Sequence, residues 1–190
     1  MMTLKSKHYA ISAAAISAVL MSTPVSAETC DLASTNDMTH QISASVATVH
    51  TSVLIDASPS NVWQTLLDFD SMPTWSSAIQ GVTGDLKDGN DVVVTYNFGV
   101  DDSGAPITNE IPHKLIFSDG ETFGWSDPLP EFLGGGKDKH LYQVIPCGEK
   151  TLFVQSDEVI GNPNAMAFVN QLLPTYQLFN AELKQAVESN

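Results

Sequence analysis

Two histidines and two tyrosines are the side chains in this sequence best placed to do chemistry together. Tyr96, His113, His140 and Tyr142 each lie in a stretch where apolar and polar residues alternate. Alternate residues of a β-strand point to the same side, so this spacing predicts that all four face one side of a sheet. That side also carries most of the apolar residues of the same stretches, and we expect it to face the interior.

The chemistry open to these side chains is hydrogen bonding and proton transfer. His113 and His140 can each donate to a ligand carbonyl, or act as a general base where the surroundings bring the imidazole pKa near neutrality. Tyr96 or Tyr142 would then orient the carbonyl. Each histidine has a simpler alternative, as a partly buried side chain whose polar atoms are satisfied within the protein. Both interpretations stay open at this stage.

A mostly apolar pocket with a few polar groups is what a small lipophilic ligand requires. The residues predicted to line it are Tyr96, Phe98, His113, Phe117, Phe123, Trp125, His140, Tyr142, Glu158, Leu172, Tyr176 and Phe179. Glu158 depends on which face of 151–160 is buried, because Phe153 and Val159 favour the opposite face.

Other chemistries lack their sequence signals. The chain has no His-x-x-x-His or Cys-x-x-Cys spacing, and a zinc site would have to be assembled from scattered side chains. The run Gly134-Gly135-Gly136-Lys137 lacks the Walker spacing, and we interpret it as a loop at the cavity mouth. No Gly-x-Ser-x-Gly elbow occurs. The sequence therefore predicts no metal and no cofactor.

The elements that must position these residues follow from periodicity and turn signals. Residues 42–56 predict a first strand, and Ser58 followed by Pro59 predicts the start of a short helix. A second short helical turn is expected near Met72–Trp75. Turn-separated strands follow, and a long apolar stripe predicts a C-terminal helix capped by Asn162. This order favours an α+β fold, a curved antiparallel sheet wrapped around that helix.

Two stretches resemble one known superfamily. The stretch 55–75 reads I-x-A-S-P-x-x-V-W-x-x-L-x-D-F-x-x-x-P-x-W, and the stretch 123–161 is similar to W … H-x-F-x-L-x-P … T-x-V … E-x-x-G. Both resemble the START-like, SRPBCC superfamily of polyketide cyclases/dehydrases and lipid-transport proteins. The resemblance spans roughly residues 47–188 and implies a helix-grip fold. It also implies roles that range from carrying sterols, lipids or plant hormones to closing polyketide rings.

The first 27 residues have the pattern of a secretory signal: Lys5 and Lys7, an apolar stretch from 10 to 21, and Val25-Ser26-Ala27. That stretch is too short for a membrane anchor, which needs about 20 apolar residues. We therefore expect cleavage near Ala27, a periplasmic or extracellular protein, a polar leader at 28–41, and one domain at 42–190.

The charge of the chain indicates which classes of partner it disfavours, and its cysteine content indicates whether a disulfide is expected. The net charge is −14 and the chain contains no arginine, so binding to nucleic acid or to anionic lipid headgroups is disfavoured. Cys30 and Cys147 are the two cysteines, and an even count in an exported chain predicts one disulfide. Two unpaired cysteines remain the alternative.

Three functions stay open. The first is an exported, non-enzymatic protein that binds a small hydrophobic ligand in a cavity between the sheet and the C-terminal helix, without stable membrane insertion. The second is a cyclase- or dehydratase-like enzyme that uses His113 and His140 as proton carriers. The third is an interaction protein that uses only the scaffold. The lack of a compact catalytic motif favours the first, and the sequence makes no prediction about oligomeric state.

Overall fold

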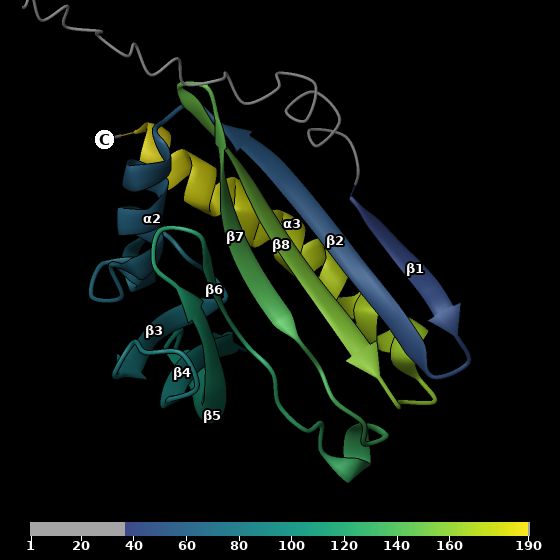
Figure 1. The fold of residues 1–190 in the computed structure, drawn as a ribbon. Helices are drawn as coiled ribbons and strands as arrows, with labels where there is room; N and C mark the ends of the chain where they lie inside the picture. The colour runs from purple at the N-terminus through teal and green to yellow at the C-terminus, as the bar shows by residue number, and fades with distance from the viewer. Residues whose placement is uncertain (1–36, 190) are drawn as a thin grey trace, which may run out of the picture.

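A computed structural model describes residues 37–189 of the chain. Eight antiparallel strands form one strongly curved sheet in the order β1-β2-β8-β7-β6-β5-β4-β3, and α3 lies along its concave side (Figure 1). The strands are β1 (Met38–Ser43), β2 (Val46–Ile55), β3 (Ile79–Gly84), β4 (Asp91–Val100), β5 (Pro106–Ser118), β6 (Thr122–Trp125), β7 (His140–Cys147) and β8 (Lys150–Ile160). This is the predicted α+β, helix-grip fold.

Of the described helical elements, only α2 begins at a residue whose side chain caps it. α2 (Pro59–Leu67) starts after Ser58, whose Oγ accepts a hydrogen bond from the Asn61 backbone at 3.3 Å. The second expected short helix is a 3₁₀ turn, η1 (Met72–Thr74), and a further turn, η2 (Glu131–Leu133), precedes β7. One short α-helix, rather than two, therefore follows β2.

α3 (Ala165–Glu188) begins later than predicted. Asn162 does not cap it, because the Asn162 amide donates to the carbonyls of Leu133 and Gly135 at 2.9 and 3.0 Å. Its Oδ1 accepts from the Asn164 backbone at 2.7 Å, and Asn164 is the residue that flanks the helix. Asn162 thus fixes the 134–136 glycine loop to the end of β8 instead of starting the helix.

The N-terminal boundary also differs from the expectation. The polar stretch predicted as leader, 28–41, contributes residues 38–41 to β1, which pairs with β2. β1 is short, polar and mostly exposed, so its sequence lacks the buried face that makes strands recognisable. The predicted signal segment 1–27, its cleavage site and Cys30 lie outside the described residues.

The core lies between the concave side of the sheet and the two α-helices. Its larger part joins α2 and the C-terminal half of α3 to the sheet through residues such as Leu66, Phe153, Phe179 and Leu183. A smaller cluster packs the first half of α3 on β2 and β8, with Val169 at its centre. No helix within residues 37–189 has the length and hydropathy needed to cross a membrane.

Candidate functional site

A chain of hydrogen bonds joins Tyr96, His113 and Asp127. The Tyr96 hydroxyl lies 3.0 Å from His113 Nε2, and His113 Nδ1 lies 2.7 Å from Asp127 Oδ2. Asp127 Oδ1 also accepts the Lys114 backbone N–H at 2.9 Å, which fixes the carboxylate. His113 is buried, whereas Tyr96 and Asp127 are partly exposed. These hydrogen bonds therefore link two partly exposed side chains through a buried imidazole.

The direction of these hydrogen bonds follows from the carboxylate. An ionised Asp127 can only accept, so His113 Nδ1 carries a proton and donates it. In the neutral imidazole Nε2 is then the acceptor, and it takes the Tyr96 hydroxyl proton. Within residues 37–189 no donor hydrogen-bonds to the Tyr96 oxygen, so its lone pairs can accept a hydrogen bond from a ligand. Burial, with nearby acidic side chains, raises the pKa of Tyr96 well above its usual value, so the phenol stays neutral.

Strand pairing and sheet curvature position these three side chains. Tyr96 comes from β4 and His113 from the adjacent β5, while Asp127 follows the end of β6, where Trp125 pairs with Leu115. The alternation Phe123, Trp125, Asp127 continues the inward face of β6 past its last paired residue. Sequence reasoning missed Asp127, although this continued alternation was a signal that could have found it.

Aromatic rings surround the polar chain and fill the interior. The His113 ring stacks on Trp125 with centroids 4.7 Å apart, and Trp125 meets His140 edge to face at 4.8 Å. His140 in turn lies 4.5 Å from Tyr142 and stacks on Tyr176 at 4.6 Å. These contacts place the rings on one face of the sheet, as the sequence predicts. Their side chains occupy the space that was expected to be a cavity, since Trp125 is 2% exposed and Tyr142 1%.

The two histidines differ in what they can do. His140 is buried, and desolvation, with a smaller effect of the His113 charge, lowers the His140 pKa from 6.5 to about 3. Its Nε2 lies 2.9 Å from Gln155 Nε2, so the neutral imidazole accepts that amide hydrogen. His140 thus matches the simpler of the two sequence interpretations, a buried and satisfied histidine. His113 alone keeps a route to the surface, through Tyr96.

A second polar group lies on β8 under α3. Tyr176 donates to Asp157 Oδ2 at 2.9 Å, and the Lys139 backbone donates to Asp157 Oδ1 at 3.3 Å. Burial, followed by the charge of Asp138, raises the Asp157 pKa from 3.8 to about 7. Asp138 is itself shifted upward in pKa, chiefly by burial, with a smaller effect of Asp127. Sequence reasoning missed Asp157 because the choice of inward residues on β8 depended on which face of that strand is buried.

The expected inward position of Glu158 is wrong. Phe153 packs on Tyr142 and Phe179, and Gln155 and Asp157 bond to interior partners, so the odd-numbered residues of β8 face inward. Glu158 alternates to the other side of the strand and is only partly buried. The buried amide and carboxyl groups, which favour neither face by hydropathy, hid this parity in the sequence.

The remaining predicted residues divide between core and surface. Phe123 and Phe179 are buried in the larger core, and Phe117 packs on its margin against Trp63, with ring centroids 5.8 Å apart. Leu172 packs on the smaller cluster. Phe98 is instead 63% exposed, next to the Tyr96 ring. The 134–136 loop is held by Asn162 at the end of β8.

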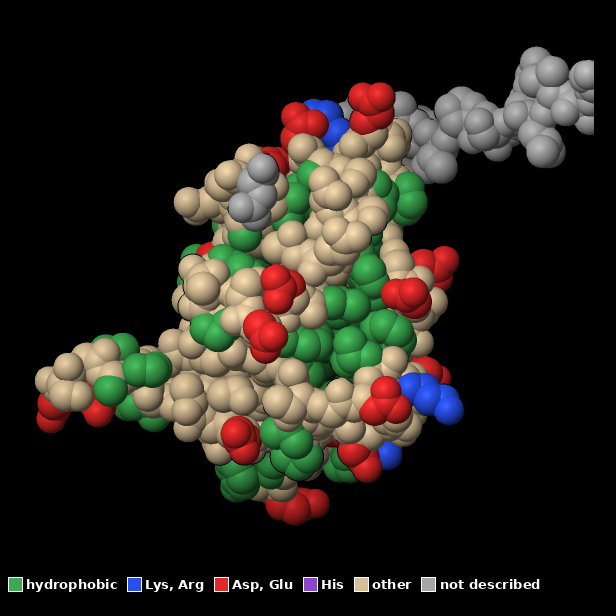
Figure 2. Space-filling view, turned by 90° about the vertical axis from the view of Figure 1, so that its left-hand side faces the viewer, with side chains coloured by type: hydrophobic (Ala, Val, Ile, Leu, Met, Phe, Trp, Pro, Cys, Tyr) green, Lys and Arg blue, Asp and Glu red, His purple; other side chains and the backbone are tan. Residues whose placement is uncertain are grey.

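The surface offers hollows and a strongly acidic face. One hollow of about 460 Å³ lies between β2 and α3, lined by Val53, Asn180 and Lys184 among others, and another of about 630 Å³ lies between α3 and the α2–η1 segment. The ring cluster lines neither of them. Hydrophobic side chains gather in the middle of the face that carries α2 and β3, bordered by many acidic and few basic side chains (Figure 2). Among residues 37–189 no three acidic, histidine or cysteine side chains are grouped to hold a metal ion.

Comparison with known proteins identifies a family. Residues 46–188 match the family model described as polyketide cyclase / dehydrase and lipid transport. No curated protein matches the sequence.

Solved structures share the fold at low sequence identity. The di-domain aromatase/cyclase StfQ of the steffimycin biosynthetic pathway covers 76% of this chain at 13% identity and a TM-score of 0.54, and this chain spans about half, 51%, of that protein. The Zhui aromatase/cyclase from Streptomyces sp. R1128 covers 75% of this chain, which covers 94% of it, at 14% identity and a TM-score of 0.53. A START superfamily protein from Mycobacterium smegmatis gives 75% and 97% coverage, 16% identity and a TM-score of 0.51. At these identities the likeness shows the fold alone.

Proposed function

We propose that this chain, which belongs to the polyketide cyclase/dehydrase and lipid-transport family, is an exported protein that binds a small hydrophobic ligand carrying one polar group. The observation that carries the proposal is the chain from Tyr96 through His113 to Asp127, with bonds of 3.0 and 2.7 Å. It presents one oriented polar atom, the Tyr96 oxygen, among aromatic rings. Ligand sites of this kind use a few placed polar groups to orient a mostly apolar molecule.

The direction of these hydrogen bonds specifies the polar group of the ligand. Because the Tyr96 hydroxyl donates its hydrogen bond to His113, the Tyr96 oxygen can only accept a hydrogen bond from a ligand. The complementary ligand group is a hydroxyl or N–H donor. A negative ligand is disfavoured, since the protein carries a net charge of −14. Among molecules with such a donor we take a neutral lipophilic alcohol or phenol as the proposed ligand.

A proton-transfer enzyme is the second candidate, and one observation favours it. The Asp127 carboxylate bonded to His113 Nδ1 is the arrangement that holds a general base in one tautomer. When His113 is protonated, Nε2–H points at the Tyr96 oxygen and frees the Tyr96 hydroxyl to donate to a ligand carbonyl. In this version His113 is the proton carrier, and His140, with a pKa of about 3, is not.

The binding proposal is tested by titrating the chain from Glu28 onward with 4-butylphenol and, as a matched probe without a donor, 4-butylanisole. Isothermal titration calorimetry should show binding of the phenol and weaker binding of the anisole. Tyr96→Phe removes the accepting oxygen and should cost about 0.5–1.5 kcal/mol for the phenol, with little change for the anisole. Lys114→Ala is the control, because Lys114 is exposed and pairs with Asp91 on the outer side of β5.

The results of these experiments distinguish the candidate functions. Equal binding of both probes, unaffected by Tyr96→Phe, contradicts the role of the polar chain. Absence of any binding contradicts the ligand-binding function and leaves an interaction role for the scaffold. Native mass spectrometry of protein from its own host should detect a bound neutral lipophilic mass. If a substrate is found, His113→Ala should lower its turnover by about 10²–10⁴ with binding largely kept, whereas a binder loses only modest affinity.

A further inference from the structure

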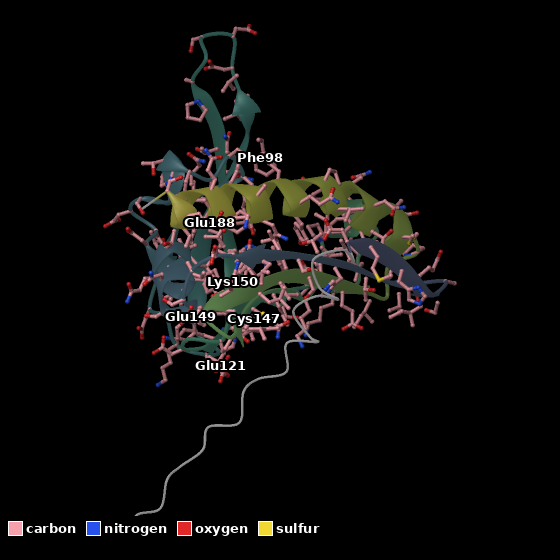
Figure 3. The ribbon with its side chains drawn as sticks, turned by 90° about the horizontal axis from the view of Figure 1, so that it is seen from above. Phe98, Glu121, Cys147, Glu149, Lys150 and Glu188 are labelled. Atoms are coloured by element: carbon pink, nitrogen blue, oxygen red, sulfur yellow. The ribbon has the colours of Figure 1, made fainter. Side chains whose placement is uncertain are left out.

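The end of β4 and the start of β5 form a two-stranded ribbon, residues 97–108, that projects from the body of the protein. Figure 2 shows this projection at the lower left, with hydrophobic side chains along it and acidic side chains near its tip. Phe98 lies where the ribbon leaves the body, as its label in Figure 3 shows. Phe98 and Val100 are each 63% exposed and Ile107 is 48% exposed. Large apolar side chains this exposed on a projecting element indicate a contact surface.

Strand register decides which of these side chains share a face. Asn97 pairs with Thr108 and Val100 with Pro106, so β4 has one extra residue between these pairs. Gly99, with φ of 117°, lies at this bulge. Phe98 therefore lies opposite Ile107.

The two faces of the ribbon differ as a result. Phe98 and Ile107 share a face with Tyr96, whose ring centroid is 6.4 Å from that of Phe98. Val100 lies on the opposite face. The apolar face formed by Phe98 and Ile107, which we call the ribbon face, is therefore continuous with Tyr96.

The interior leaves the apolar part of a ligand at Tyr96 with no space behind it. The Tyr96 ring meets Trp125 edge to face at 6.3 Å and His113 at 5.8 Å. Trp125 and Tyr142 behind it are almost completely buried and in ring contact with each other. The exposed apolar surface in ring contact with Tyr96 is Phe98, at the start of the ribbon face.

We propose that the ribbon face is the second half of the ligand site and binds the alkyl or aryl part of an elongated, neutral alcohol or phenol. The inference rests on the proposed function, because the hydroxyl end of the ligand donates to the Tyr96 oxygen. Its apolar end then lies across Phe98 and Ile107. Charge disfavours an anionic occupant, since Asp101 and Asp102 lie at the ribbon tip and acidic residues outnumber basic ones 22 to 8.

A series of 4-alkylphenols with methyl, propyl, pentyl and heptyl chains tests this geometry by calorimetry on the chain from Glu28 onward. A methylene that is completely buried raises affinity about fourfold. On one open face we expect about twofold for each added methylene. Phe98→Ser combined with Ile107→Ser should flatten this dependence on chain length and leave the affinity for 4-methylphenol nearly unchanged. Val100→Ser is the matched control, because Val100 is as exposed as Phe98 and lies on the opposite face of the same ribbon.

The outcomes separate this inference from the proposed function. If 4-methylphenol binds through Tyr96 but the dependence on chain length is the same in the Phe98→Ser/Ile107→Ser variant, the ribbon face is not part of the site. If Val100→Ser has the same effect, the contact is not specific to this face, and the inference also fails. If no alkylphenol binds, the proposed function and the inference fail together. If the wild type sediments as a dimer that Phe98→Ser dissociates, a second copy covers the ribbon face and the proposal is overturned.

Discussion

His113 and Asp127 lie 2.7 Å apart between Nδ1 and Oδ2, although 14 residues separate them in the sequence. The second oxygen of Asp127 accepts the backbone N–H of Lys114, the neighbour of His113. The carboxylate is thus fixed to the same strand as the imidazole that it orients. This relationship sets the direction of every hydrogen bond out to Tyr96, and it can be reversed by a change of one atom type.

We predict that Asp127→Asn reverses the preference of the site from donors to acceptors. The amide oxygen should stay on the Lys114 N–H, which leaves the amide NH₂ facing His113 Nδ1. His113 must then carry its proton on Nε2 and donate to the Tyr96 oxygen, which frees the Tyr96 hydroxyl to donate. Calorimetry should show weaker binding of 4-butylphenol and stronger binding of 4-butylacetophenone. Asp102→Asn, at the ribbon tip, is the control, and an unchanged preference in Asp127→Asn would show that the tautomer is not set by Asp127.

We predict that two buried groups give opposite pH dependences of stability. The Asp157 pKa is raised from 3.8 to about 7, so the folded state holds a proton that the unfolded state releases, and stability is lost as the pH rises through about 7. The His140 pKa is lowered from 6.5 to about 3, so stability is lost as the pH falls from 6.5. The two slopes should largely cancel between about pH 4 and pH 6.5.

Asp157→Asn should remove one of these slopes and expose the other. Its free energy of unfolding should rise with pH between about 4 and 6.5, and between about pH 6.5 and 7 the variant should lack the loss of stability that the wild type shows. Guanidinium unfolding at pH 4.5, 6 and 8 measures this. Asp102→Asn, on the exposed tip, should follow the wild type. If the wild type and Asp157→Asn have parallel pH profiles, Asp157 does not titrate in this range in the folded protein.

We predict that Cys30 and Cys147 are joined in the mature protein. Cys147 is the last residue of β7 and pairs with Lys150 across the hairpin to β8, and Figure 3 shows it near Lys150. A bond to Cys30 would close a long loop and should contribute at most about 4–5 kcal/mol to the free energy of unfolding. Peptide mapping without reduction should recover the two peptides linked. Two free thiols in freshly isolated exported protein would contradict this prediction.

We predict that the mature protein begins at Glu28. The basic start, the apolar stretch and Val25-Ser26-Ala27 follow in the order of a cleaved signal. N-terminal sequencing of protein from its own host should identify Glu28 as the first residue. An Ala27→Leu substitution at the last position of the cleavage motif should slow processing, because this position requires a small residue. An intact Met1 in the total protein pool would remove the basis for export.

The sequence by itself determined the elements that are periodic and sharply bounded. Ser58 and Pro59 mark the start of α2 to the residue, because the cap is a local interaction between residues three apart. The two-residue period of β4, β5 and β7 places Tyr96, His113 and His140 on one face, because side-chain direction in a strand depends only on parity. The family resemblance and the fold follow from these same local patterns.

Tertiary structure decided what depends on contacts distant in the sequence. The face of β8 is ambiguous by hydropathy, and it was settled by Phe153 packing on Phe179 and by Tyr176 bonding to Asp157. The difference between His113 and His140 arises because one reaches Asp127 and Tyr96 and the other is enclosed by rings. Burial and partners of this kind set a pKa and the direction of a hydrogen bond, and they exist only when the sheet has curved around α3.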